Sequence, residues 1–452
     1  GGLAHVEGTP YRGEQELIAC DNVTQKAPRW FASLHSRSVP PCQPLAPLAP
    51  STMRSLVVTV GTRVARVLLS LWVVFTGVFL ALAYVPNPHT TTAAYQPRLF
   101  GGLAFHEEAT GRDPWADFPA ARFVVPEAQV VFDGDDAWLT VTALDAEADA
   151  DTVGDRLDEL RATLEALDDA PPEGPPGVSD RHRTTSVEAW HESVDAAVSR
   201  IRAGDLQKVV LAQALEVELD RPAAAPDLLA RLGGTYPDCH RFLVEPNGGA
   251  SFLGATPERL VSLRGREVET GALAGTTGRG DTDDEDEWLA NELLGSEKDN
   301  HEHELVAETI REQLAPLSAD IRVGDRGIRK LATVQHLWTP IDATLERDEH
   351  VLSLVDALHP TPAVGGLPPA AALDVIRDTE PFDRGWYAAP VGWFDADGDG
   401  SFAVAIRSAI VEETLATLFA GVGLVADSDP DAEWDEVQLK YRPILDELER
   451  DD

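Results

Sequence analysis

The stretch QKVVLAQALEVEL (207–219) is a long run of apolar and β-branched residues, which is typical of a buried β-strand. Shorter runs of the same character predict further strands at 241–245, 251–254, 259–264, 268–273, 401–411 and 414–420, the last two as a hairpin. Helices do not alternate regularly with these strands, so the βαβ pattern of a parallel sheet is absent. We therefore expect a large α+β domain built on long antiparallel strands.

Helices and a second hairpin are predicted around these strands. Between Ser186 and Gly204 apolar residues recur at helical spacing, and the two ends carry residue types that cap helices. Other helices are expected at 151–167, 303–314 and 431–449, and strands 122–132 and 137–144 are expected to form a hairpin around DGDD (133–136).

The chain is strongly acidic: 77 Asp and Glu residues against 37 Lys and Arg in 452 residues give a net charge of −40. Nucleic acids bind basic surfaces, so this charge argues against DNA or RNA as a partner. Only five basic residues are lysines: Lys26, Lys208, Lys298, Lys330 and Lys440. An acidic, lysine-poor surface is typical of a halophilic cytoplasm, because molar salt shortens the screening length to about 3 Å.

Lysine is therefore informative wherever it is retained, since arginine cannot act as a base near neutral pH. The cysteines are equally sparse. Cys20, Cys42 and Cys239 form neither a disulfide framework nor a zinc-binding spacing, which favours a reducing, cytoplasmic location.

The first 96 residues differ in composition from the rest. No acidic residue occurs between Asp21 and Glu107, and VLLSLWVVFTGVFLALAYV (67–85) is long and apolar enough to span a membrane. Three interpretations are open: a shifted reading frame, a membrane anchor, or a buried core segment. We favour the shifted frame, because the acidic bias stops and resumes abruptly. We divide the chain into an anomalous region, 1–96, and a folded domain, 97–452, with a proline- and glycine-rich linker near 168–181.

Two acidic pairs have the spacing that places both carboxylates on one helical face: Asp299 with Glu302, and Glu433 with Glu436. Four converging oxygen donors would suit Mg²⁺, but spacing alone favours the plainer interpretation, two acidic pairs on solvated helix faces. DADGDG (395–400) has calcium-loop spacing but lacks the final Glu and the flanking helices, so we interpret it as a turn.

Lys208 and Glu258 are candidates for acid–base chemistry. Partial burial in a strand would favour the neutral amine of Lys208, and the apolar approach FLGATP (252–257) would favour the protonated carboxyl group of Glu258. The alternative is a lysine at a strand edge and a surface glutamate. GALAGTTGRG (271–280) is a glycine-rich loop whose backbone N–H groups could approach an anion.

Eight blocks between residues 97 and 450 together resemble the chorismate-utilising enzymes. They are QKVVLA (207–212), FLGATPERL (252–260), ETGALAGT (269–276), SEKDNHEHELV (296–306), LATVQHLWT (331–339), RGWYAAPVGW (384–393), FAVAIRSA (402–409) and GVGLVADSDPDAEWDE (421–436). The resemblance implies an α+β, anthranilate synthase component I-like fold, in which two large, mostly antiparallel sheets pack together with helices outside. It also implies chorismate as substrate and Mg²⁺ as cofactor, with no obligatory protein partner.

The resemblance also implies roles for individual positions. Glu302 and Glu436 match direct metal ligands, and Asp299 and Glu433 match residues that hold the waters of the metal. The positions that match substrate-binding residues are Gly275, Thr276, His336, Tyr387, Arg407, Gly421, Gly423 and Lys440.

Lys208 and Ala274 distinguish between reactions in this family. Members that add ammonia to chorismate, the anthranilate and aminodeoxychorismate synthases, lack the strand lysine and typically read PIAGT or PIKGT where this chain reads ALAGT. We therefore expect water as nucleophile and isochorismate as product, with Lys208 as the base and Glu258 as the acid. Menaquinone synthesis is the expected pathway. The alternatives are a salicylate synthase, an aminating synthase, or an inactive binding protein anchored through 67–85.

Overall fold

The computed structural model describes residues 96–106, 112–133, 136–143, 150–167, 170–246 and 249–450. The run 67–85 and the proposed frame shift therefore lie outside the described residues. Within the described ranges, no helix has the length and apolar character needed to cross a membrane.

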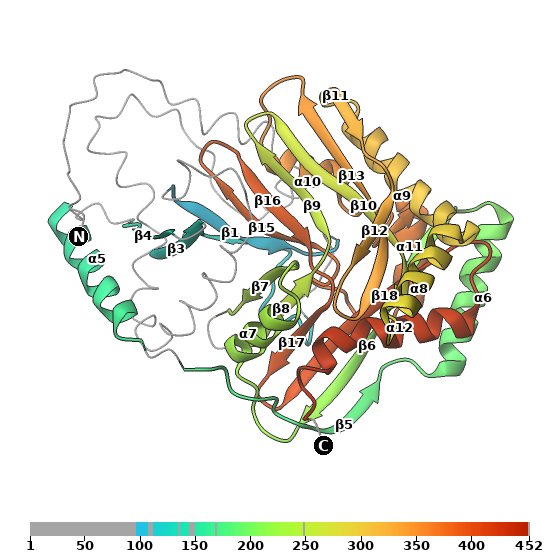
Figure 1. Cartoon of the computed structure of the whole chain (residues 1–452), viewed down its shortest axis with the longest axis horizontal. Coiled ribbons are helices and arrows are strands. Elements are labelled where there is room, and N and C mark those ends of the chain that lie inside the picture. Colours follow the sequence, from blue (N-terminus) through green and yellow to red (C-terminus); the bar gives the residue numbers. More distant parts are fainter. Residues whose placement is uncertain are drawn as a thin grey trace, which may run out of the picture. The chain divides into compact units, whose positions relative to one another are not determined.

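Two large antiparallel sheets dominate the described residues (Figure 1). The nine-stranded sheet contains β1 (Arg98–Leu103), β2 (Ala121–Val124), β9 (Arg259–Arg264), β10 (Glu267–Gly278), β11 (Ser318–Val323), β12 (Gly327–Lys330), β13 (Val334–Leu345), β15 (Pro390–Asp395) and β16 (Gly400–Val404). Its order is β11–β13–β10–β9–β16–β15–β1–β2, with β12 also paired to β13. The predicted strand 268–273 lies within the longer β10 of this sheet.

The seven-stranded sheet contains β5 (Val178–Arg183), β6 (Lys208–Leu219), β7 (His240–Val244), β8 (Ser251–Thr256), β14 (Gly366–Leu367), β17 (Ser408–Glu412) and β18 (Leu415–Leu424). Its order is β14–β6–β18–β17–β8–β7, with β5 also paired to β6. A separate hairpin joins β3 (Ala128–Asp133) to β4 (Asp136–Val141). The hairpin around DGDD is thus confirmed, but the predicted strand 122–132 is divided between β2 and β3.

Aromatic side chains connect the two sheets. The ring of Phe118 packs edge-on against Trp386 (centroids 5.4 Å apart) and Phe252 of β8 (6.0 Å). Trp386 in turn lies against Gly102 of β1, where a Cβ atom would be only 2.7 Å from the indole ring. This layer therefore joins β1 of the nine-stranded sheet to β8 of the seven-stranded sheet, as expected for two sheets that pack together.

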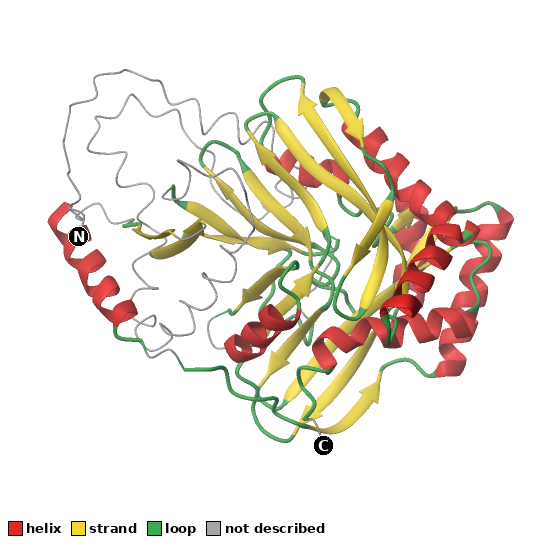
Figure 2. Ribbon diagram, in the orientation of Figure 1, coloured by secondary structure: helices red, strands yellow, loops and turns green. Residues whose placement is uncertain are grey.

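Helices lie outside the sheets (Figure 2). Three pack on the nine-stranded sheet: α8 (Asp283–Gly295), α9 (Glu297–Leu314) and α10 (Val351–Leu358). Four pack on the seven-stranded sheet: α6 (Val187–Ala203), α7 (Ala225–Thr235), α11 (Pro369–Thr379) and α12 (Pro430–Leu445). A further helix, α5 (Ala150–Glu165), contacts β4.

Capping residues fix where the site-bearing helices begin. In α6 the predicted caps are confirmed, because Ser186 accepts a hydrogen bond from the Ala189 N–H and Gly204 adopts φ 85°. Ser296 caps α9 by accepting from the Asp299 N–H, so this helix begins six residues before the predicted 303–314. Asp429 caps α12 with Pro430 in its first turn, close to the predicted start.

Two of the points at which the chain passes between the two sheets are neighbours in space. One is the segment between β8 and β9, which contains Glu258, and the other lies between β16 and β17, which contains Arg407. The Val404 N–H donates to the Glu258 carbonyl (3.0 Å), and the Ala255 N–H donates to the Arg407 carbonyl (3.2 Å). The prediction of one strand over 401–411 is therefore wrong: Arg407, at φ 52°, turns the chain from one sheet into the other.

Candidate active site

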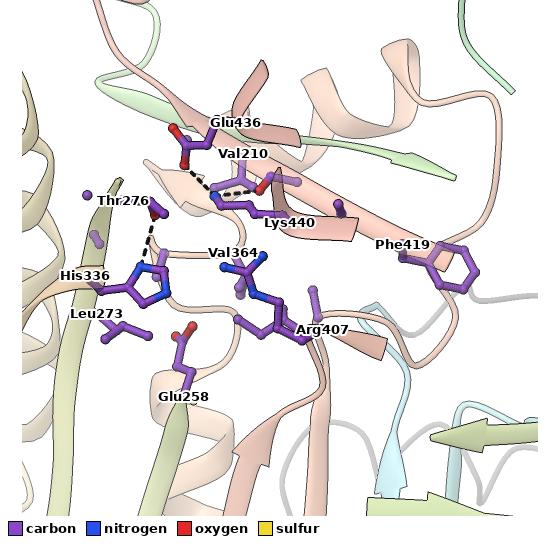
Figure 3. A pocket seen from close by; sticks show the side chains of 18 of the residues that line it. Val210, Glu258, Leu273, Thr276, His336, Val364, Arg407, Phe419, Glu436 and Lys440 are labelled. Atoms are coloured by element: carbon purple, nitrogen blue, oxygen red, sulfur yellow. Dashed lines mark hydrogen bonds and ion pairs between the residues drawn. The ribbon is translucent and has the colours of Figure 1, made fainter. Parts of the chain in front are cut away.

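A cavity of about 60 Å³ lies where strands of both sheets meet (Figure 3). The predicted site residues that line it are Glu258, Gly275, Thr276, Glu302, His336, Tyr387, Arg407, Gly421, Gly423, Glu436 and Lys440. Lys208, Asp299 and Glu433 lie behind this lining. The volume is well below the roughly 300 Å³ of a typical ligand pocket, so a substituted six-membered ring enters only when some of these side chains move.

Lys208 is the first residue of β6 and is completely buried. Its Nζ lies 2.9 Å from Oε1 of Glu302 on α9. Gly423 on β18 makes room for this pair, since a Cβ atom there would be 2.3 Å from Glu302 Oε1 and 2.7 Å from Lys208 Cε. The predicted strand lysine is thus placed in contact with a predicted metal ligand.

Glu258 points into the cavity from the crossing between β8 and β9 (Figure 3). Its side chain is buried, and burial raises the pKa of its carboxyl group to about 7, although the charges of Lys208 and Lys440 oppose the increase. A carboxyl group with this pKa is partly protonated at neutral pH, so it can donate a proton.

Arg407 and His336 provide unused hydrogen-bonding capacity at the same cavity. Nη1 of Arg407 and Nε2 of His336 are both buried without a hydrogen-bond partner. Burial holds the pKa of His336 well below its usual value, so its imidazole is neutral, and its Nδ1 is 3.1 Å from the Thr276 hydroxyl. A buried guanidinium with a free N–H is suited to a carboxylate.

The remaining predicted substrate residues complete the cavity wall. Lys440 forms an ion pair with Glu436 (2.7 Å) and donates to the Gly421 carbonyl (2.9 Å). Tyr387 stacks on Phe419 with centroids 5.2 Å apart. Gly275 has φ 77° at an irregularity of β10, and a Cβ atom there would be 3.2 Å from the Asp299 side chain, so glycine suits both its conformation and its contacts.

The four predicted metal residues extend from the first turns of α9 and α12. Burial and the charges of Glu302 and Glu436 raise the pKa of Asp299, and burial together with the charge of Glu436 raises that of Glu433. Burial also opposes ionisation of Glu436, but Lys440 reverses this and lowers its pKa. The charges of neighbouring carboxylates and of Lys440 thus act on the ionisation of Asp299, Glu433 and Glu436.

Residues 79–449 match the family model described as "Chorismate binding enzyme". The chain belongs to this family. It is 40% identical over 361 residues to the salicylate biosynthesis isochorismate synthase of Pseudomonas aeruginosa, covering 78% of this chain and 74% of the relative. It is 35% identical to isochorismate synthase MenF of Bacillus subtilis, covering 79% and 75%.

Solved structures give the same placement among the chorismate-binding enzymes. MenF, the menaquinone-specific isochorismate synthase from Escherichia coli, superimposes with a TM-score of 0.68 at 29% identity, covering 78% of this chain and 79% of that one. Anthranilate synthase component I from Streptococcus pneumoniae gives 0.68 at 25% identity, covering 81% and 84%. The chorismate-binding fold is thus confirmed, and the sequence relatives place this enzyme close to the isochorismate synthases.

The acid residues of this chorismate-binding enzyme fit a hard cation. Carboxylate oxygens are the donors that Mg²⁺ prefers, and gathering four of them creates repulsion that a cation would relieve. Three lysines reduce this repulsion in the structure. Lys208 pairs with Glu302, Lys440 pairs with Glu436, and Lys298 pairs with Glu433 at 2.6 Å. In this arrangement no three acid, His or Cys residues of the described ranges are spaced to hold an ion.

Several contributing residues had no assigned role in the sequence prediction. Lys298 was visible as one of five lysines, but its partner Glu433 is 135 positions away. Thr361 lies beside Glu258 and lowers the pKa of that carboxyl group. His303 lies 3.2 Å from the Ala274 carbonyl through Nδ1 and 2.7 Å from the Thr339 hydroxyl through Nε2, which fixes α9 against β10 and β13. A polar residue within an apolar helix face is the one local signal for such a contact.

Proposed function

We propose that this enzyme is an isochorismate synthase, an isomerase that converts chorismate to isochorismate. One observation carries the proposal: Glu258, with a pKa of about 7, lines the same small cavity as Arg407, which has a free N–H, and as Glu302, which the fully buried amine of Lys208 contacts at 2.9 Å. The similarity to isochorismate synthases from several bacteria supports it.

In the proposed reaction, Lys208 leaves its ion pair with Glu302 as a neutral amine and takes a proton from the water molecule that attacks C2 of chorismate. The ring double bonds shift, the C4–O bond breaks, and Glu258 donates its proton to the departing hydroxyl group. One water enters and one leaves, so the reaction is balanced as an isomerisation. Both groups are needed, because water is a weak nucleophile and hydroxide a poor leaving group.

The cationic and polar residues of the cavity would orient the substrate. Arg407 and Lys440 would bind carboxylate groups, and neutral His336 would donate or accept a hydrogen bond. When bound by Glu302 and Glu436, with Asp299 and Glu433 behind them, Mg²⁺ would draw electron density toward the C1 carboxylate.

Product analysis tests this function. The enzyme is incubated with chorismate and Mg²⁺ at high salt, and the products are separated and identified. Isochorismate alone is the expected result. Salicylate with pyruvate would move the proposal to a salicylate synthase, and ammonia-dependent anthranilate or aminodeoxychorismate would reject it.

Two lysine variants, one at the site and one away from it, test the role of Lys208 in this reaction. Lys208→Ala should lower turnover by at least about 10³-fold, within the range of a lost general base. Lys330→Ala is the matched control, because Lys330 contacts Asp286 away from the cavity and Arg279 also holds that carboxylate. Near-normal turnover in Lys208→Ala would overturn the assignment of the base.

The cellular setting is also proposed. We infer a halophilic cytoplasm from the net charge of −40 and the scarcity of lysine and cysteine. Similarity to the menaquinone-specific enzyme of Escherichia coli supports a role in menaquinone synthesis. Deleting the gene in its own host and measuring menaquinone would test the pathway, since an unchanged menaquinone content would exclude it.

A further inference from the structure

Glu380 and Arg384 form a buried ion pair next to the cavity but outside its lining. Their side chains are 3% and 2% exposed. Nε of Arg384 donates to Glu380 Oε2 (2.8 Å), and Nη2 donates to Oε1 (2.5 Å), a two-pronged arrangement. Burying two charges is costly even when they pair, so this contact is weak evidence for stability and calls for another explanation.

The pair uses its remaining hydrogen-bonding capacity on backbone groups of β6. Glu380 Oε1 accepts from the Ala212 N–H (2.8 Å), and Arg384 Nη2 donates to the Val210 carbonyl (2.8 Å). On this side of β6, β14 pairs only with Lys208 and Val209, and the described β5 pairs from Leu215 onward. Gly365 still accepts from the Val210 N–H, and the Thr184 N–H still donates to the Ala214 carbonyl. Between these two backbone contacts, the side chains of Glu380 and Arg384 bond the Ala212 N–H and the Val210 carbonyl in place of a neighbouring strand.

The same pair holds two other parts of the cavity wall. Arg384 Nη1 donates to the Val364 carbonyl (2.7 Å), and the Arg384 guanidinium lies over the ring of Tyr387, with Cζ 6.0 Å from the ring centroid. Val364, Tyr387 and Val210 all line the cavity, although they come from three separate segments. Lys208 lies two positions before Val210, on the same face of the strand.

We propose that Glu380 and Arg384 are positioning residues, which set the base Lys208 and the ring of Tyr387 relative to the Val364 wall. This inference rests on the proposed function. Neither side chain touches the reacting atoms. They act by fixing β6 where no strand does so, and small displacements of a catalytic group can reduce turnover about 100-fold.

Two variants separate the parts of this arrangement. Arg384→Lys keeps the charge but loses the planar fork that reaches two carbonyl groups, and Glu380→Gln keeps an oxygen for the Ala212 N–H but loses the charge. We expect kcat to fall about 10- to 100-fold in Arg384→Lys and less in Glu380→Gln, while KM for chorismate changes less than kcat. If Arg384→Lys does not fold, Glu380→Gln still tests the prediction.

Matched controls distinguish positioning from lost stability. Val194→Ala creates a space in the buried face of α6, away from the cavity, and so lowers stability without touching the ion pair. Its kcat is compared with that of the Arg384 or Glu380 variant whose decrease in Tm is similar. Arg442→Lys alters an exposed i,i+4 pair with Asp446 and should be silent. Positioning would be overturned if kcat falls no more than in Val194→Ala, or if only KM changes. Wild-type product analysis tests the proposed function separately, because the positioning result is a ratio of variant to wild-type turnover for whichever product forms.

Discussion

At the scale of single residues, the burial of Glu258 favours proton donation but lowers folding stability near neutral pH. Burial raises the pKa of its carboxyl group from 4.5 to about 7. The folded state therefore binds this proton more tightly than the unfolded state does. The protonated group carries no penalty below about pH 4.5, and folding stability decreases as the pH rises toward 7, by on the order of 3 kcal/mol in total.

Glu258→Gln should separate the effect of this carboxyl group on turnover from its effect on stability. We expect the variant to lose turnover and yet to gain stability at pH 8, because the amide cannot ionise. Denaturant unfolding at pH 5 and pH 8, together with turnover, measures both effects. Glu412→Gln, on an exposed residue, provides the control. Equal unfolding free energies of wild type and Glu258→Gln at pH 8 would contradict the burial argument.

Residue composition predicted part of the site. Lysine is rare in this chain, and three of the four lysines in the described residues contact predicted metal residues. Rarity therefore directed attention to Lys208 and Lys440, which the structure places in contact with Glu302 and Glu436. It could not supply the partner of Lys298, because a contact across 135 positions depends on how α9 and α12 pack.

At the scale of elements, β18 approaches the Lys208–Glu302 pair through Gly423. Gly423→Ala should lower turnover at least about 10-fold, since the new Cβ would meet the carboxylate at 2.3 Å and displace it. Gly295→Ala is the control, because nothing lies within 4 Å of its added Cβ at the end of α8. It should leave turnover unchanged. Turnover of Gly423→Ala equal to that of the control would show that the pair tolerates displacement.

The helix α12 presents Glu436 to the cavity and Asp435 to solvent, which offers a test of the metal residues. Glu436→Gln should weaken Mg²⁺ binding about 10-fold or more, measured by calorimetry without substrate. Asp435→Asn should leave it unchanged. An identical Mg²⁺ titration of wild type and Glu436→Gln would remove Glu436 from the ligand set.

Sequence patterns predicted many elements but not their junctions. The strand 207–219 and the helix from Ser186 to Gly204 are close to β6 and α6, because periodicity and capping are local properties. The break at Arg407 was missed because FAVAIRSAIV (402–411) is mostly apolar throughout. Periodicity cannot reveal that the two halves of such a run belong to different sheets.

At the scale of the whole molecule, the net charge of −40 governs the response to salt. Raising KCl from 0.1 M to 3 M shortens the screening length from about 10 Å to below about 3 Å, so repulsion among surface carboxylates weakens. We expect the midpoint of thermal unfolding to rise. Sucrose at equal osmolality controls for general solvent effects, and a midpoint that rises no more in KCl than in sucrose would contradict the electrostatic explanation.

Glu258 and Arg407 lie at two of the places where the polypeptide passes from one sheet to the other, and hydrogen bonds hold these two places together. Any relative sliding of the two layers would therefore alter the spacing between proton donor and anion-binding group directly. A ligand that binds both Glu258 and Arg407 would therefore also hold the two sheets together. Because separating the sheets would then require the ligand to dissociate, a tightly bound ligand should slow the unfolding of both sheets.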